Sequence, residues 1–86
     1  MTDRFRLTLG QLDATVGDIA GNLAKARAAW EEGRAAGADL VALPEMFATG
    51  YQLQDLVMKP AFHRDAIRAV EACAATLAGG PAMLIG

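Results

Sequence analysis

Residues 38–45 read ADLVALPE, in which four consecutive apolar residues precede Pro44. A short apolar run without polar interruption is typical of a strand covered on both faces, as in a parallel sheet. Proline has no amide hydrogen to give to a sheet ladder, so the strand is expected to end there. The sequence therefore predicts a buried strand over residues 38–43, with Glu45 just beyond its carboxyl end.

Residues 4–12 (RFRLTLGQL) alternate in the way that a strand requires. Phe5, Leu7 and Leu9 fall on one face, and the residues between them fall on the other. This segment predicts a strand ahead of the one at residues 38–43.

A helix is predicted between these two strands. Asp18 stands where its carboxylate can accept hydrogen bonds from the first free amides of a helix. Gly37 suits the left-handed conformation that often ends a helix. Apolar residues recur between them at helical spacing, which indicates a buried stripe. These residues are Ile19, Leu23, Ala26 and Trp30.

The second half of the chain repeats this order. Residues 45–60 show no single period and are interpreted as a structured loop, with a helical turn near residues 55–58. A second helical stripe follows, and the Gly-Gly-Pro at residues 79–81 stops it. The stripe consists of Phe62, Ala66, Ala69, Val70, Cys73 and Leu77. Residues 82–86 begin a third strand.

Strand, helix, strand, helix and strand in this order indicate an α/β layered fold. Such a set leaves at least one face of the sheet uncovered. A chain of this length, 86 residues, buries only about 60% of its unfolded surface. Residues 1–86 are therefore expected to form an incomplete part of one domain.

Charge and composition argue against several classes of protein. Eight basic and ten acidic residues are scattered along the chain, unlike the basic stripe of a nucleic-acid-binding protein. No apolar run approaches the about 18 residues of a membrane helix. The start of the chain lacks the hydrophobic stretch of a signal peptide, so the cytoplasm is the expected compartment. Cys73 is the single cysteine, and no group of His, Cys and acidic residues has metal-site spacing.

Glu45 is the candidate catalytic residue, because ligands of open α/β sheets collect beyond the carboxyl ends of the strands. Pro44 fixes the backbone direction before it, and Met46 and Phe47 after it are expected to restrict the access of water. A carboxylate in this position can accept and return a proton. The Pro-Glu dipeptide by itself fits an ordinary loop or helix-start glutamate better.

The wider segment LPEMFATGYQLQDL resembles the first signature of the nitrilase, or carbon-nitrogen hydrolase, superfamily. In that signature a strand ends in Pro-Glu, and Thr-Gly-Tyr follows shortly. The matching residues in chain order are Gln11, Gly17, Asp18, Asn22, Pro44, Glu45, Thr49, Gly50 and Tyr51. The resemblance implies that residues 1–86 are the N-terminal portion of a nitrilase-type α-β-β-α sandwich.

Residues 49–62 (TGYQLQDLVMKPAF) are similar to a stretch of the glutamine-dependent NAD synthetases that reads Thr-Gly-Tyr-Pro-Pro-Glu-Asp-Leu, followed by a basic residue and a helix. The Asp-Leu at residues 55–56 and the Lys-Pro at residues 59–60 follow this pattern. Residues 52–54 read Gln-Leu-Gln instead of Pro-Pro-Glu, which weakens the match. The resemblance implies the N-terminal glutaminase domain of that family.

The resemblance further implies a Glu-Lys-Cys triad in which Glu45 is the general base. The cysteine attacks the side-chain amide of glutamine, the glutamate takes and returns the proton, and the lysine stabilises the oxyanion. The family's lysine and cysteine lie beyond Gly86, so the 86-residue piece alone is expected to be inactive. Cys73 lies on an apolar helical stripe and is expected to be a buried structural thiol. Lys25 and Lys59 are expected to be solvated.

The same resemblance implies binding partners. Tyr51 is expected either to line the glutamine pocket or to pack as an ordinary loop tyrosine. The released ammonia would pass to a downstream synthetase domain of the same chain, which uses ATP and magnesium to amidate nicotinic acid adenine dinucleotide. This segment itself is expected to bind no cofactor, and the protein is expected to form a homo-oligomer.

Two other functions stay open. A stand-alone carbon-nitrogen hydrolase, acting on an amide, nitrile or carbamoyl group, would share the residues quoted above. A non-catalytic scaffold would need no nucleophile at all. Sequence beyond residue 86 would separate them, because a Ser-Gly-Gly-Xaa-Asp pyrophosphate loop would mark the synthetase.

Overall fold

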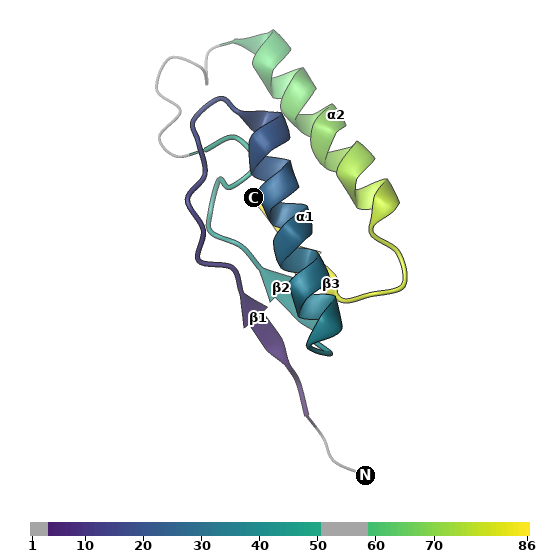
Figure 1. Cartoon of the computed structure of the whole chain (residues 1–86). Coiled ribbons are helices and arrows are strands. Elements are labelled where there is room, and N and C mark those ends of the chain that lie inside the picture. The colour runs from purple at the N-terminus through teal and green to yellow at the C-terminus, as the bar shows by residue number, and fades with distance from the viewer. Residues whose placement is uncertain (1–3, 51–58) are drawn as a thin grey trace.

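The computed structural model describes residues 4–50 and 59–86, in which strands and helices alternate as the sequence predicts (Figure 1). The elements are β1 (Leu7–Leu9), α1 (Ile19–Ala35), β2 (Leu40–Ala42), α2 (Pro60–Thr76) and β3 (Ala82–Leu84). Tyr51 and the predicted helical turn near residues 55–58 lie outside the described residues.

The three strands form one parallel sheet in the order β1-β2-β3. Its register aligns Thr8, Val41 and Met83 across the sheet. Parallel neighbours need a crossover connection, and α1 and α2 supply the two that this order requires. The predicted α/β layered fold is confirmed.

Single hydrogen bonds continue the pairing past the carboxyl ends of the short strands. The amide of Gly10 donates to the carbonyl of Ala42 over 2.8 Å, and that of Leu43 donates to Leu84 over 3.0 Å. The sheet is therefore held together up to the residue before Pro44, as the sequence predicts for the end of this strand.

The predicted caps and stripe of α1 are confirmed. The carboxylate of Asp18 accepts a hydrogen bond from the amide of Gly21 over 3.1 Å at the start of the helix. Gly37, just past the end, has a φ of +77°. Of the predicted stripe, three residues are buried and the first is half-buried: Leu23, Ala26, Trp30 and Ile19.

The inward face of α2 is also the predicted one. The six apolar residues of its predicted stripe are all half-buried, and no residue of the helix is fully buried. The helix begins at Pro60, two residues before Phe62, because proline is well suited to the first helical turn. Helical periodicity thus identified the inward side of α2 but not its shallow packing.

The core lies between the sheet and both helices. Trp30 of α1 is 2% exposed and packs with Val41, and the same cluster is contacted by Leu77 and Met83. Because Val41 and Met83 are neighbours on one face of the sheet, α1 and α2 cover that same face, as right-handed crossovers require. The indole Nε1 of Trp30 donates to the carbonyl of Pro81 over 2.8 Å, which ties α1 to the start of β3.

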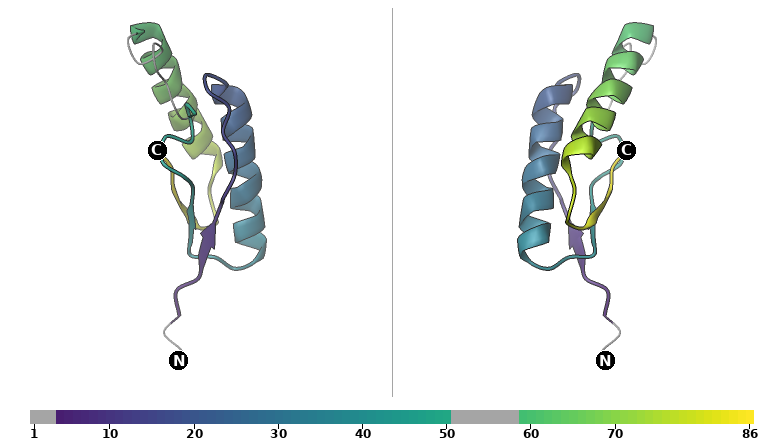
Figure 2. Two further views of the ribbon diagram at one scale, coloured as in Figure 1. Left: turned by 90° about the vertical axis from the view of Figure 1, so that its left-hand side faces the viewer. Right: turned by 90° about the vertical axis from the view of Figure 1, so that its right-hand side faces the viewer.

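The opposite face of the sheet is open and apolar. Leu7, Leu9 and Leu84 on this face are 50%, 62% and 61% exposed. The expectation that β2 is covered on both faces is wrong for the described residues, since both helices pack on the side of Val41. Figure 2 shows the molecule from two sides, with α1 and α2 next to each other. The uncovered sheet face that the sequence predicts is present.

Candidate active site

Glu45 begins a turn that follows β2 at the carboxyl edge of the sheet. Its side chain is exposed and lines a hollow of about 200 Å³, which we call the rim hollow. The rim hollow is bounded by Leu12, Asp13, Ala14, Pro44, Glu45 and Phe47. The carboxylate thus lies where the topology of a parallel sheet places ligand sites.

The two apolar residues after Glu45 do not shield it in the expected way. Phe47 is 1% exposed and Met46 is half-buried, yet Glu45 itself remains exposed. The expectation that both would restrict the access of water to the carboxylate is wrong for the described residues. Phe47 instead forms part of the wall of the rim hollow and anchors the turn.

The backbone directly after Glu45 is strained. Met46 has a φ of +55°, a left-handed conformation that residues other than glycine rarely adopt. The amide of Gly50 donates to the carbonyl of Met46 over 2.8 Å and closes residues 45–50 into a compact turn, which we call the Glu45 turn. Such strain persists only where surrounding contacts hold it.

Asn22 supplies one of these contacts and was not singled out as a functional residue from the sequence. It is 0% exposed, and its Nδ2 donates to the carbonyl of Ala48 over 3.1 Å. The available signal was an amide on the inward side of an amphipathic helix, next to Leu23. Buried amides of this kind are almost always hydrogen-bonded, so such a position predicts a contact of structural or functional value.

Three further residues quoted from the sequence lie outside the Glu45 turn: Gln11, Lys25 and Lys59. Lys25 and Lys59 are exposed as expected, and the ammonium of Lys25 donates to the carbonyl of Asp13 over 2.7 Å. Gln11 is exposed at the same edge of the sheet as Glu45 and lines a hollow that includes Pro44. Tyr51 lies outside the described residues.

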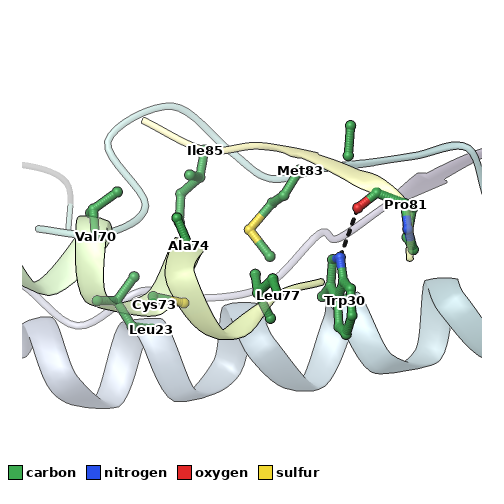
Figure 3. A pocket seen from close by; sticks show the side chains of 10 residues that line it. Leu23, Trp30, Val70, Cys73, Ala74, Leu77, Pro81, Met83 and Ile85 are labelled. Atoms are coloured by element: carbon green, nitrogen blue, oxygen red, sulfur yellow. Dashed lines mark hydrogen bonds between the residues drawn. The ribbon is translucent and has the colours of Figure 1, made fainter. Parts of the chain in front are cut away.

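A second hollow, of about 190 Å³, lies between α1, α2 and β3 (Figure 3). Its walls are mainly apolar and include Cys73, which is half-buried where the sequence predicts a buried structural thiol. Trp30 and Leu77 line it as well. It shares no lining residue with the rim hollow, and its lining includes no carboxylate or ammonium group.

Within residues 4–50 and 59–86, no group of three or more His, Cys, Asp or Glu side chains gathers where it could hold a metal ion. In the same part of the chain, neither helix is long and apolar enough to span a bilayer.

Known proteins resemble this chain over most of its length. It is 69% identical over all 86 residues to the glutamine-dependent NAD(+) synthetase of Rhodobacter capsulatus, and covers 16% of that protein. It is 44% identical over 62 residues to the enzyme of the same name from Thermotoga maritima, of which it covers 11%. The crystal structure of a glutamine-dependent NAD(+) synthetase from Cytophaga hutchinsonii superposes on 85% of this chain with a TM-score of 0.79 at 27% identity.

That structural match covers 13% of the Cytophaga chain, so this sequence spans less than a fifth of each of these relatives. The sequence likeness to the Rhodobacter protein covers the whole of this chain, and therefore all three strands and both helices. Residues 6–82 match the profile of the carbon-nitrogen hydrolase family. The fold and this match agree, and the chain belongs to the carbon-nitrogen hydrolase family.

Proposed function

We propose that this chain forms part of a glutaminase that supplies ammonia for ATP-dependent NAD synthesis, with Glu45 as its general base. The observation that carries the proposal is the 69% identity over the whole chain to a glutamine-dependent NAD(+) synthetase. The position of Glu45 supports it, since an exposed carboxylate beside the rim hollow is accessible to groups outside this chain.

In the proposed mechanism Glu45 acts first as a general base and then as a general acid. The carboxylate takes the proton of a cysteine thiol, and the thiolate attacks the carbonyl carbon of the glutamine side-chain amide. A lysine ammonium stabilises the resulting oxyanion. The protonated Glu45 returns its proton to the departing nitrogen, and ammonia leaves behind a thioester. Glu45 then accepts a proton from the water that attacks the thioester carbonyl, the carbon-sulfur bond breaks to release glutamate, and Glu45 returns this proton to the cysteine sulfur.

The cysteine and the lysine would come from residues outside this sequence, because neither Cys73 nor either lysine, Lys25 or Lys59, is among the described residues that line the rim hollow. Tyr51 is proposed to contact the bound glutamine. The ammonia would amidate nicotinic acid adenine dinucleotide in a synthetase domain. In this proposal ATP and magnesium belong to that amidation and not to the hydrolysis in which Glu45 acts.

The test is the substitution Glu45→Gln in the complete gene product. The amide keeps the size of the side chain but cannot accept the thiol proton, so glutamine-driven NAD formation is expected to fall by at least about 100-fold, the lower range for loss of a general base. Ammonia-driven NAD formation should remain. Both rates are measured by following NAD at saturating ATP.

Glu31→Gln is the matched control, because Glu31 is exposed on α1 and lines none of the hollows described above. It should leave both rates unchanged. Equal loss of the two rates in Glu45→Gln would contradict the role of Glu45. Glutamine hydrolysis without NAD formation from either nitrogen source would instead favour a stand-alone hydrolase.

A further inference from the structure

Within residues 4–50 and 59–86, three hydrogen bonds attach the Glu45 turn to other segments of the chain. The Nδ2 of Asn22 donates to the carbonyl of Ala48 over 3.1 Å. The amide of Gly17 donates to the carbonyl of Thr49 over 2.9 Å, and the amide of Ala48 donates to the carbonyl of Gly86 over 3.0 Å. Asn22 is the one side chain among these partners, since the other bonds join backbone to backbone.

The same amide group also holds the loop between β1 and α1. The Oδ1 of Asn22 accepts a hydrogen bond from the amide of Thr15 over 2.7 Å, and its Nδ2 donates to the carbonyl of Thr15 over 2.8 Å. Both Nδ2 hydrogens are therefore used, one for each loop. In the described part of the chain, Asn22 is the one polar residue among the buried residues. It joins the first turn of α1 to two loops that are distant in sequence.

The position of Asn22 links this network to Glu45. Ala48 lies three residues after Glu45, and the left-handed Met46 stands between them. A strained conformation relaxes when the contacts that hold it are removed. Loss of the hydrogen bond from Asn22 would leave the carbonyl of Ala48 without this partner. Met46 could then relax, and this relaxation would rotate the backbone that carries the Glu45 side chain.

The loop beneath the turn leaves it little alternative space. A Cβ at Gly50 would come within 2.6 Å of the Cα of Val16 and 2.7 Å of the carbonyl carbon of Thr15, so the two loops are in direct backbone contact. Asn22 binds Thr15 at one side of this contact and Ala48 at the other. The amide thus fixes the distance between the loops and the height of the turn above the sheet edge.

We infer that Asn22 is a positioning residue for Glu45, which holds the carboxylate at the rim hollow by clamping the Glu45 turn to the loop before α1. This inference rests on the proposed function of Glu45. Asn22 contacts neither substrate nor the reacting atoms in this account, because it is buried and does not line the rim hollow.

The first test compares Asn22→Ala with Leu23→Ala in the complete gene product. Leu23 is the next residue of α1, is 8% exposed, and makes no side-chain hydrogen bond to either loop. Asn22→Ala is expected to lower the kcat of glutamine-driven NAD formation by roughly 100-fold, the effect of a misplacement of about 1 Å. The KM for glutamine and the ammonia-driven rate should stay within about twofold of the parent, a change of less than about 0.5 kcal/mol.

Leu23→Ala should lower the melting temperature and keep the glutamine-driven kcat. If both variants lose kcat in proportion to their melting temperatures, Asn22 has only a structural role and the inference is overturned. Should Asn22→Ala fail to fold, Asn22→Asp replaces it. Asn22→Asp keeps the shape of the side chain and the oxygen that accepts from the Thr15 amide. When ionised it cannot donate to the carbonyls of Thr15 and Ala48, so the same selective loss of kcat is expected.

The second test is a double-mutant cycle with Glu45→Gln. If Asn22 acts through Glu45, adding Asn22→Ala to Glu45→Gln should leave the residual glutamine-driven rate unchanged, because the positioned group is already absent. Multiplicative losses would overturn the inference. Full glutamine-driven activity in Glu45→Gln would instead overturn the proposed function. If Glu45→Gln loses glutamine-driven activity but Asn22→Ala keeps a normal kcat, only the inference about Asn22 is overturned.

Discussion

The Glu45 turn contains two residues in the left-handed region, and only one of them is a glycine. Met46 has a φ of +55° and Gly50 a φ of +85°. At Gly50 the absence of a side chain serves a second purpose, since the backbone of Val16 occupies the place where a Cβ would stand. One glycine therefore permits both the conformation of the turn and its close contact with the preceding loop.

The first prediction compares Gly50→Ala with Gly79→Ala. Both glycines have positive φ, but a Cβ at Gly79 would meet nothing within 4 Å. Gly79→Ala should therefore cost only the left-handed penalty of about 1–2 kcal/mol. Gly50→Ala should cost more than that, because backbone atoms must also move. Thermal unfolding of the complete gene product measures both, and equal shifts in melting temperature would show that the contact with Val16 carries no energy.

Residues with local conformational roles were predictable from the sequence, whereas residues whose roles depend on distant loops were not. Asp18 caps α1 and Gly37 adopts positive φ because these roles depend on immediate neighbours. The burial of Asn22 depends on Ala48, which is 26 positions later in the chain. The conformation of Met46 depends on its neighbour Gly86, which is 40 positions later. Helix periodicity and turn preferences contain no information on these contacts.

At the scale of elements, the two helices differ in how deeply they pack. The inward stripe of α1 reaches full burial at Ala26 and nearly so at Trp30, while every residue on the stripe of α2 is only half-buried. The periodicity of a sequence gives the direction of the inward face but not the tightness of the contact. The hollow beside Cys73 is the space that this looser packing leaves between the helices.

The second prediction is that Cys73→Ala has a small effect on stability and none on chemistry. The thiol lines the hollow between the helices, so its loss enlarges an existing space and should cost roughly 1 kcal/mol. Glutamine-driven NAD formation should be kept. Val70→Ala is the control, because Val70 lines the same hollow without a sulfur atom. Selective loss of the thioester intermediate in Cys73→Ala would overturn the structural assignment of this cysteine.

At the scale of the whole molecule, the open face of the sheet exposes large apolar side chains, among them Leu7, Leu9 and Leu84. The register aligns Leu7 with Leu40, and Leu9 with Ala42 and Leu84, all on the side away from the helices. The sequence predicts that one face of the sheet is uncovered, but it does not predict which one. Alternation in β1 assigns its residues to two faces, but it does not show which of these faces the helices cover. The orientation follows from Val41, whose burial against Trp30 turns the neighbouring side chains outward.

The third prediction concerns the polypeptide of residues 1–86 by itself. Its open sheet face exposes Leu9 and Leu84 by 62% and 61%, and apolar surface of this kind favours association. Sedimentation velocity is expected to detect oligomers that the double substitution Leu9→Lys and Leu84→Lys disperses, because two charges oppose burial of that face. Ile67→Lys is the control, since Ile67 is 59% exposed on α2, which does not lie on the open face of the sheet, and it should leave association unchanged. A monodisperse monomer that unfolds cooperatively would show that the open face does not drive association.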